Sequence, residues 1–203
     1  MKSQRLFLGG LLALCALAIG SAAQAQATFE STPHTSFDNA PVVSGPLTFT
    51  TAGFHAVGDS GSLSPISPIA GDGNFLVYNS TVGFGDSFSM SALAPFNLLA
   101  LDLAGWYNFG PSAQAVTVTG IRADNSTVSA NLSVLPGSFT HFALLGFSNL
   151  TAVNLVHGGS SASYYVGVDN IVTTPVPEPA TFAMMLGGLV LLAYAARRRQ
   201  QSH

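Results

Sequence analysis

The chain has 203 residues, of which only 7% are charged, and its formal net charge is −3. Such a composition offers no basic surface to a phosphate backbone, which excludes nucleic-acid binding. A single cysteine excludes an intramolecular disulfide.

Residues 1–25 have the parts of an export signal. Lys2 and Arg5 form a positive start, and a long apolar run follows. Small-x-small patterns then end at Ala25 and at Ala27. We therefore predict signal cleavage after one of these two alanines.

The only cysteine, Cys15, lies inside this apolar run. A lipoprotein signal would need a small residue before the cysteine, whereas Leu14 is large. We therefore expect Cys15 to leave with the signal, so that the mature chain has no catalytic or metal-binding thiol.

Residues 28–174 form one predicted domain, long enough for a single core. Arg122 is its only Lys or Arg, which gives a net charge of −7 against eight acids. The missing lysines exclude Schiff-base chemistry, and the missing cations disfavour contact with anionic lipids. The acids are Glu30, Asp38, Asp59, Asp72, Asp86, Asp102, Asp124 and Asp169.

The residue pattern of this domain is β throughout. Apolar and polar residues alternate in its short runs, and Gly, Pro, Asn, Asp and Ser separate them. We predict an all-β fold, a β-sandwich or jelly roll of about nine or ten strands. The expected strands are 47–49, 75–77, 87–92, 98–103, 116–119, 128–134, 139–145, 150–156 and 164–172.

Two motifs invite a hydrolase interpretation. Residues 58–61, Gly-Asp-Ser-Gly, resemble the nucleophile signature of chymotrypsin-like proteases, and the Gly-Asp-Ser at 58–60 and 85–87 resembles the first block of SGNH hydrolases. The partner motifs of both families are missing, and Gly-Asp-Ser is also a common turn sequence. We expect turns here, and no enzyme.

Four other residues have side chains suited to binding. His141 and His157 lie in separate expected strands without ligand spacing, which is typical of packed or edge histidines. Trp106 and Tyr107 lie in a glycine-flanked segment, where exposed rings would stack on sugars. The alternative is that these two rings close the end of the sandwich.

Residues 175–203 have three distinct parts. Val176, Pro177, Glu178 and Pro179 come first, and an uncharged apolar run follows over 180–196. Such a run predicts a transmembrane helix of roughly 25 Å, slightly short of a bilayer core. Arg197, Arg198 and Arg199 then favour a cytoplasmic end. A buried C-terminal core helix is the alternative.

This order of motif, helix and arginines resembles the PEP-CTERM sorting signal. The resemblance implies that an exosortase, a membrane-embedded enzyme, recognises and processes the tail. It also implies export through the inner membrane, anchoring there before processing, and a later location at the cell surface or outside it.

The domain resembles jelly rolls of the carbohydrate-binding-module and galactose-binding-like type. The likeness lies in four segments, 28–30, 118–120, 147–153 and 168–171. In such domains an acid on the first strand and an aspartate on the last often share a structural Ca²⁺, which implies Glu30 and Asp169 here. The alternative is that both acids make turn hydrogen bonds.

These features together indicate an exported, exosortase-processed surface or matrix protein with a non-catalytic sandwich. The sandwich is expected to associate with exopolysaccharide or biofilm, and its low positive charge favours a neutral polysaccharide. The alternatives are a glycan-active hydrolase or lyase on the same fold, and a structural adhesin without a ligand. Paired carboxylates in a cleft would favour the enzyme.

Overall fold

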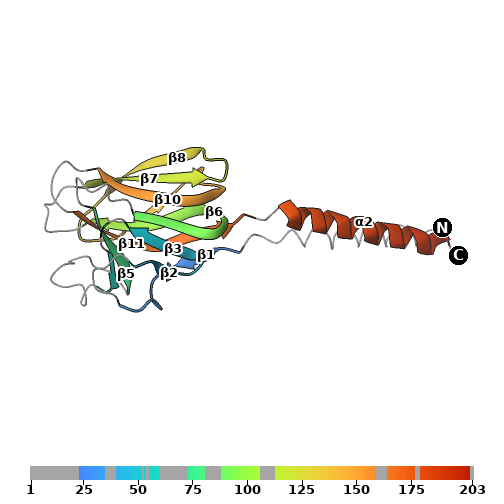
Figure 1. Cartoon of the computed structure of the whole chain (residues 1–203), viewed down its shortest axis with the longest axis horizontal. Coiled ribbons are helices and arrows are strands. Elements are labelled where there is room, and N and C mark those ends of the chain that lie inside the picture. The colour runs from blue at the N-terminus through green and yellow to red at the C-terminus, as the bar shows by residue number, and fades with distance from the viewer. Residues whose placement is uncertain are drawn as a thin grey trace.

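The computed structural model describes residues 23–34, 40–51, 53, 55–59, 73–80, 88–105, 113–158, 164–176 and 179–201. These residues form eleven strands and one helix (Figure 1). The elements are β1 Ala25–Ala27, β2 Val42–Ser44, β3 Leu47–Thr51, β4 His55–Gly58, β5 Phe75–Ser80, β6 Phe88–Gly105, β7 Gln114–Arg122, β8 Thr127–Val134, β9 Thr140–Ala143, β10 Leu150–Gly158, β11 Tyr164–Pro175 and α2 Pro179–Gln201.

The strands form one antiparallel sheet that folds over on itself along β6. The order β4-β5-β11-β6-β10-β7-β8 is extended by β1 on β11, by the pair β2-β3 on β6, and by β9 on β6. The first half of β6 pairs with β3 and β10, and its second half pairs with β11 and β9. The two halves of the sheet therefore face each other, and the predicted all-β sandwich is confirmed.

One core fills the space between the two halves. Val116 and Val118 of β7 belong to the same buried cluster as Leu76 of β5 and Val168 of β11. Along β7 the buried apolar positions alternate with more exposed ones, as a strand with one buried face requires.

A column of four aromatic rings lies in this core. Phe29 contacts Phe49 at 5.0 Å between ring centroids, Phe49 stacks on Phe88 at 5.7 Å, and Phe88 stacks on Tyr78 at 4.7 Å. All four rings are at most 1% exposed. They link β3, β5 and β6 through apolar burial, worth roughly 25 cal/mol per Å².

Helix α2 projects away from one end of the sandwich (Figure 1). It begins at Pro179, where the missing N–H of proline leaves no helical hydrogen bond unmade. The sequence predicts a membrane span over 180–196, but among the residues that the structure describes no helix is long and apolar enough to cross a membrane.

Candidate functional site

A row of polar side chains crosses the outer face of the half-sheet formed by β11, β6 and β9. Asp102 of β6 is the register partner of Asp169 on one side and of His141 on the other. Residues directly opposite in antiparallel strands point to the same face. The fold thus brings together three side chains from distant parts of the chain.

Asp102 lies at the centre of this row and accepts hydrogen bonds at both of its oxygens. Its Oδ1 lies 2.6 Å from Nδ1 of His141, and Nδ2 of Asn170 donates to its Oδ2 at 3.0 Å. Nε2 of Gln26 in β1 in turn donates to Oδ1 of Asn170 at 2.9 Å. Four strands therefore contribute to one continuous network.

Asn170 has the backbone conformation that this network needs. Its φ is +48°, in the left-handed region that asparagine tolerates better than most residues. The register of β11 against β6 shifts directly after Asp169, so Asn170 lies in a bulge. Bulges re-aim side chains, and this one directs the Asn170 amide to Asp102.

Asp102 and Asp169 form the carboxylate pair that the sequence did not reveal. Cross-strand partners have Cβ atoms about 4.5–5.5 Å apart, where like charges destabilise a sheet. The backbone N–H of Asn170 donates to Oδ1 of Asp169 at 2.7 Å, and only 4% of Asp169 is exposed. Hydrogen bonds to both carboxylates offset their repulsion. Because these bonds and burial occupy their oxygens, the two aspartates do not form an open acid–base pair.

His141 is the exposed end of the row. Its side chain is 62% exposed, whereas that of Asp102 is 16% exposed. An ionised carboxylate can only accept, so Nδ1 of His141 is the donor to Asp102. The ring is thereby oriented with Nε2 available to a ligand in solvent.

An apolar cluster adjoins the polar row on the same face. Ala104 lies two residues beyond Asp102, and Phe139 lies two residues before His141. The Phe139 ring meets Phe75 edge-on at 5.3 Å between centroids, and Tyr165 packs against the same cluster. On this face, polar groups therefore lie beside the partly buried rings of Phe139 and Tyr165.

The predicted metal ligands differ in environment. Glu30 is exposed, and its Oε2 accepts from the Asn74 N–H at 3.3 Å, whereas Asp169 is buried. Within the described part of the chain, no three His, Cys, Asp or Glu side chains gather as a metal site would require. Calcium binding by Glu30 and Asp169 stays a prediction.

The remaining residues that the sequence analysis considered for binding lie in different places. Trp106 and Tyr107 lie outside the described residues, directly after the end of β6. His157 is buried in β10, and burial lowers the pKa of its imidazole. The link between His141 and Asp102 was missed because 39 residues separate them and no local motif joins them.

The two predicted signal-cleavage positions lie at the ends of β1. Ala25 pairs with Thr173, and Ala27 pairs with Ile171 and is buried. Cleavage after Ala25 would leave two residues of this strand in place, whereas cleavage after Ala27 would remove the strand. The position of cleavage stays a prediction.

The tail begins within the sandwich itself. Val176 donates its N–H to the Pro95 carbonyl at 3.1 Å, directly after β11. Pro177 and Glu178 lie outside the described residues, and Pro179 begins α2. Arg197 and Arg198 are exposed on the last turns of α2, which also include Arg199.

Residues 175–199 match the family model described as the PEP-CTERM protein-sorting motif. The tail is a PEP-CTERM sorting motif. It includes all four predicted motif residues, 176–179, and all three arginines, 197–199. A search of curated proteins finds no match to the chain.

Solved structures similar to this chain include carbohydrate-binding modules. The family 22 module of Clostridium thermocellum Xyn10B is 11% identical, with a TM-score of 0.41 over 74% of this chain and 92% of that one. A family 29 module complexed with mannohexaose is 10% identical, with a TM-score of 0.44 over 77% and 94%.

A tailspike domain of bacteriophage CBA120 is also similar. It is 13% identical, with a TM-score of 0.40 over 64% of this chain. The chain spans about a fifth of that domain, 19% of its length.

Proposed function

We propose that this chain is the exported precursor of a cell-surface or matrix protein, which an exosortase processes through its sorting motif and whose sandwich binds a neutral polysaccharide. The observation that carries the first part is the sorting motif at 175–199. The motif implies export and C-terminal anchoring in the membrane before processing. The partner would be exopolysaccharide around the cell or in a biofilm.

The sorting step can be tested with a triple variant, Pro177→Ala, Glu178→Ala and Pro179→Ala. In an exosortase-bearing host we expect an unprocessed, membrane-retained form, detected by its mass and by fractionation. The matched control is Gln200→Ala with Gln201→Ala, which lies just beyond the matched residues. A triple variant that is trimmed and released like the parent would contradict this proposal.

The second part of the proposal rests on the face around His141. Polar groups that are held by neighbours, as His141 is by Asp102, bind sugar hydroxyls without losing much side-chain entropy. Phe139 and Tyr165 lie beside them as apolar surface. With one cation among residues 28–174, the domain cannot bind an anionic polymer by ion pairing, so the ligand is a neutral glycan.

The variant His141→Ala tests this face. We expect retention on insoluble neutral polysaccharide to fall several-fold, with an unchanged circular dichroism spectrum. His34→Ala is the matched control, because His34 is also exposed and hydrogen-bonded, 2.9 Å from Asn74 Oδ1. Retention by His141→Ala equal to that of the parent would exclude His141 from the binding face. Loss only in Trp106→Ala would instead assign the ligand to the segment that follows β6.

Binding is favoured over catalysis by the state of the carboxylates. Both oxygens of Asp102 have partners, and Asp169 is buried. A glycosidase needs one carboxylic acid and one carboxylate that reach the scissile bond. Release of new reducing ends from the bound polysaccharide would contradict the non-catalytic proposal.

A further inference from the structure

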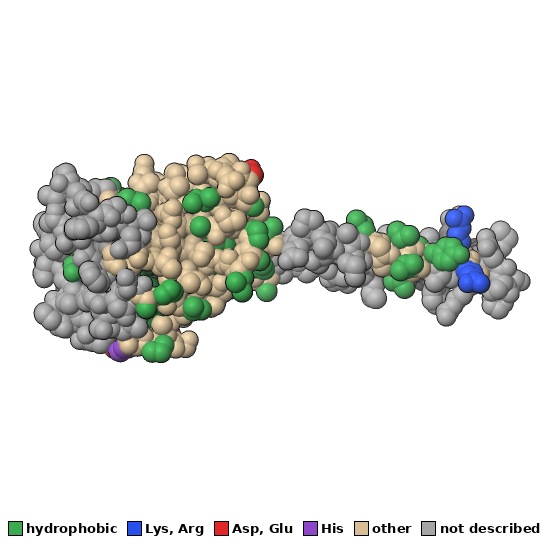
Figure 2. Space-filling model, in the orientation of Figure 1, with side chains coloured by type: hydrophobic (Ala, Val, Ile, Leu, Met, Phe, Trp, Pro, Cys, Tyr) green, Lys and Arg blue, Asp and Glu red, His purple; other side chains and the backbone are tan. Residues whose placement is uncertain are grey.

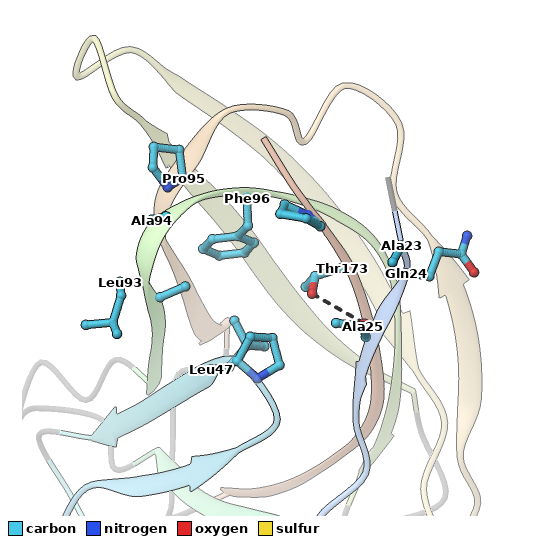
Figure 3. A pocket seen from close by; sticks show the side chains of 12 residues that line it. Ala23, Gln24, Ala25, Leu47, Leu93, Ala94, Pro95, Phe96 and Thr173 are labelled. Carbon is cyan, nitrogen blue, oxygen red and sulfur yellow. Dashed lines mark hydrogen bonds between the residues drawn. The ribbon is translucent and has the colours of Figure 1, made fainter. Parts of the chain in front are cut away.

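An apolar pocket of about 470 Å³ opens at one end of the sandwich (Figure 3). Leu93, Pro95 and Phe96 from the bend of β6 form one side of it, and Leu47 of β3 forms another. Among the described residues that line the pocket none is charged, and the polar ones are Gln24, which belongs to the predicted signal, and Thr173. The Thr173 hydroxyl donates to the Ala25 carbonyl at 3.3 Å.

The pocket lies at the end of the sandwich from which the tail leaves. Pro175, the last residue of β11, lines the pocket, and the next residue, Val176, bonds to Pro95 on its rim. Only residues 176–178 separate β11 from α2. Three residues, or four Cα–Cα steps, span at most about 14 Å, so the pocket cannot lie far from the start of α2.

The rim of the pocket is apolar and open to solvent. Leu93 has an exposed fraction of 109%, the largest value among the exposed apolar residues of the described chain. Leu145 is 91% exposed in the turn between β9 and β10, and Phe147 of that turn accepts from the Leu98 N–H near the same bend. Figure 2 shows apolar side chains gathered on the side of the domain that faces α2.

We propose that this end of the sandwich, with Leu93 and the pocket behind it, rests in the interface of the bilayer that holds the tail. The proposal rests on the proposed membrane anchoring, since the short connection from Pro175 to α2 directs this end toward the bilayer. Single apolar side chains on a surface are common, whereas a group of them around an uncharged pocket marks an interaction site.

The contact is apolar and does not depend on anionic lipids. Arg122, the one cation of residues 28–174, is bonded through its guanidinium to the Ser126 hydroxyl and to the carbonyls of Thr127 and Gly146. A neutral phosphatidylcholine bilayer is therefore the appropriate probe.

A fluorescent label at residue 93 tests the contact. The signal is cleaved before the experiment, because its own apolar run would hold the chain on vesicles. Cys15, the one cysteine of the sequence, leaves with the signal, so Leu93→Cys can be labelled specifically with an environment-sensitive dye. The chain is then reconstituted into phosphatidylcholine vesicles that contain a lipid-bound quencher. We expect blue-shifted emission and several-fold stronger quenching than for Leu135→Cys, an exposed site whose carbonyl bonds to Gly105 at the far end of β6.

Vesicle flotation separates the two proposals. If the chain floats but the label at 93 behaves like the label at 135, the bilayer contact is wrong and the anchoring stands. If the chain does not float, it does not bind the vesicles, and the anchoring and the bilayer contact both fail. A blue shift at 93 without vesicles, rising with protein concentration, would show that a second copy covers the pocket and would overturn the proposal.

Discussion

Tyr78 places a phenol hydroxyl inside the aromatic column of the core. The residue is fully buried, and among the described residues its hydroxyl has no hydrogen-bond partner. A buried donor without a partner costs about 1–3 kcal/mol. We therefore expect Tyr78→Phe, which keeps the ring stacked on Phe88, to raise the free energy of unfolding by about 1 kcal/mol in a denaturant titration.

Tyr78 also predicts how stability responds to alkaline pH. Burial raises the pKa of its hydroxyl well above the usual tyrosine value of about 10, so the folded state keeps a proton that the unfolded state loses. Below pH 10 the proton is bound in both states, and the titration of Tyr78 does not change the free energy of unfolding. Above pH 10 that free energy falls by about 1.4 kcal/mol per pH unit until the folded state also loses the proton. Melting curves should show a steeper alkaline decline for the parent than for Tyr78→Phe, and equal slopes would contradict the assignment.

For single residues, the sequence indicated which side chains are of interest, but it did not indicate which side chains they contact. Asp169 was singled out, and it lies in the polar row, but beside Asp102 and Asn170 instead of in a demonstrated metal site. His141 was expected as a packed or edge histidine, and it lies on β9, which pairs with β6 and with no other described strand. Its carboxylate partner depends on strand pairing, which no local motif encodes.

At the scale of the elements, two turn glycines show two different reasons for having no side chain, a positive φ and a lack of space. Gly45, in the turn between β2 and β3, has φ +57°, and a Cβ there would lie 2.9 Å from the Gln26 carbonyl oxygen. Gly146 has φ +79°, and a Cβ there would meet nothing within 4 Å. The two positions share the strained φ but differ in the space around them.

We expect Gly146→Ala to lower the free energy of unfolding by about 1 kcal/mol, and Gly45→Ala by about 1–3 kcal/mol more. The larger effect arises because the added methyl displaces β1 from its seat against β11. Amide exchange at Gln26 and Ala27 should accelerate only in Gly45→Ala. An equal loss of unfolding free energy in both variants would mean that the turn between β2 and β3 adjusts to the methyl group without moving β1.

Alternation predicted the longer strands well. Residues 116–119 and 128–134 fall within β7 and β8, where polar and apolar positions alternate. The segments 87–92 and 98–103 were predicted as separate strands, but Phe88–Gly105 is one bent strand. The bend coincides with Pro95 and with a shift in the register between β6 and β10. A proline inside a strand pattern usually marks an interruption, so the sequence alone favours two strands. The strands β1, β2 and β4 were missed, because three or four residues are too few to show a period.

At the scale of the whole molecule, the end of β11 is bonded to β6 just before the sorting motif. Asn97 donates its Nδ2 to the Thr174 hydroxyl at 3.0 Å, and Pro175 pairs with Phe96 just before the motif residues. An enzyme that needs residues 174–175 extended and free must first separate them from β6. Loss of one such bond, worth about 1 kcal/mol, raises the open fraction about fivefold.

We therefore expect Thr174→Val to speed exosortase processing severalfold in pulse-chase labelling, since valine keeps the shape and removes the acceptor. Thr117→Val is the matched control, because it removes a comparable cross-strand bond, 2.8 Å to Asn131, far from the tail. Faster processing in both variants would indicate general loosening, and no change in either would show that the strand end does not limit access.

Strand β11 has one further consequence, for mechanical load. It is an inner strand, paired with β6 along Val166–Pro175 and with β5 and β1 on its other side. Its hydrogen bonds lie perpendicular to the strand, so a pull along the tail loads them in shear, many at once, instead of peeling them singly. A force on the tail is thereby spread over β6, β5 and β1 before β11 can leave the sheet.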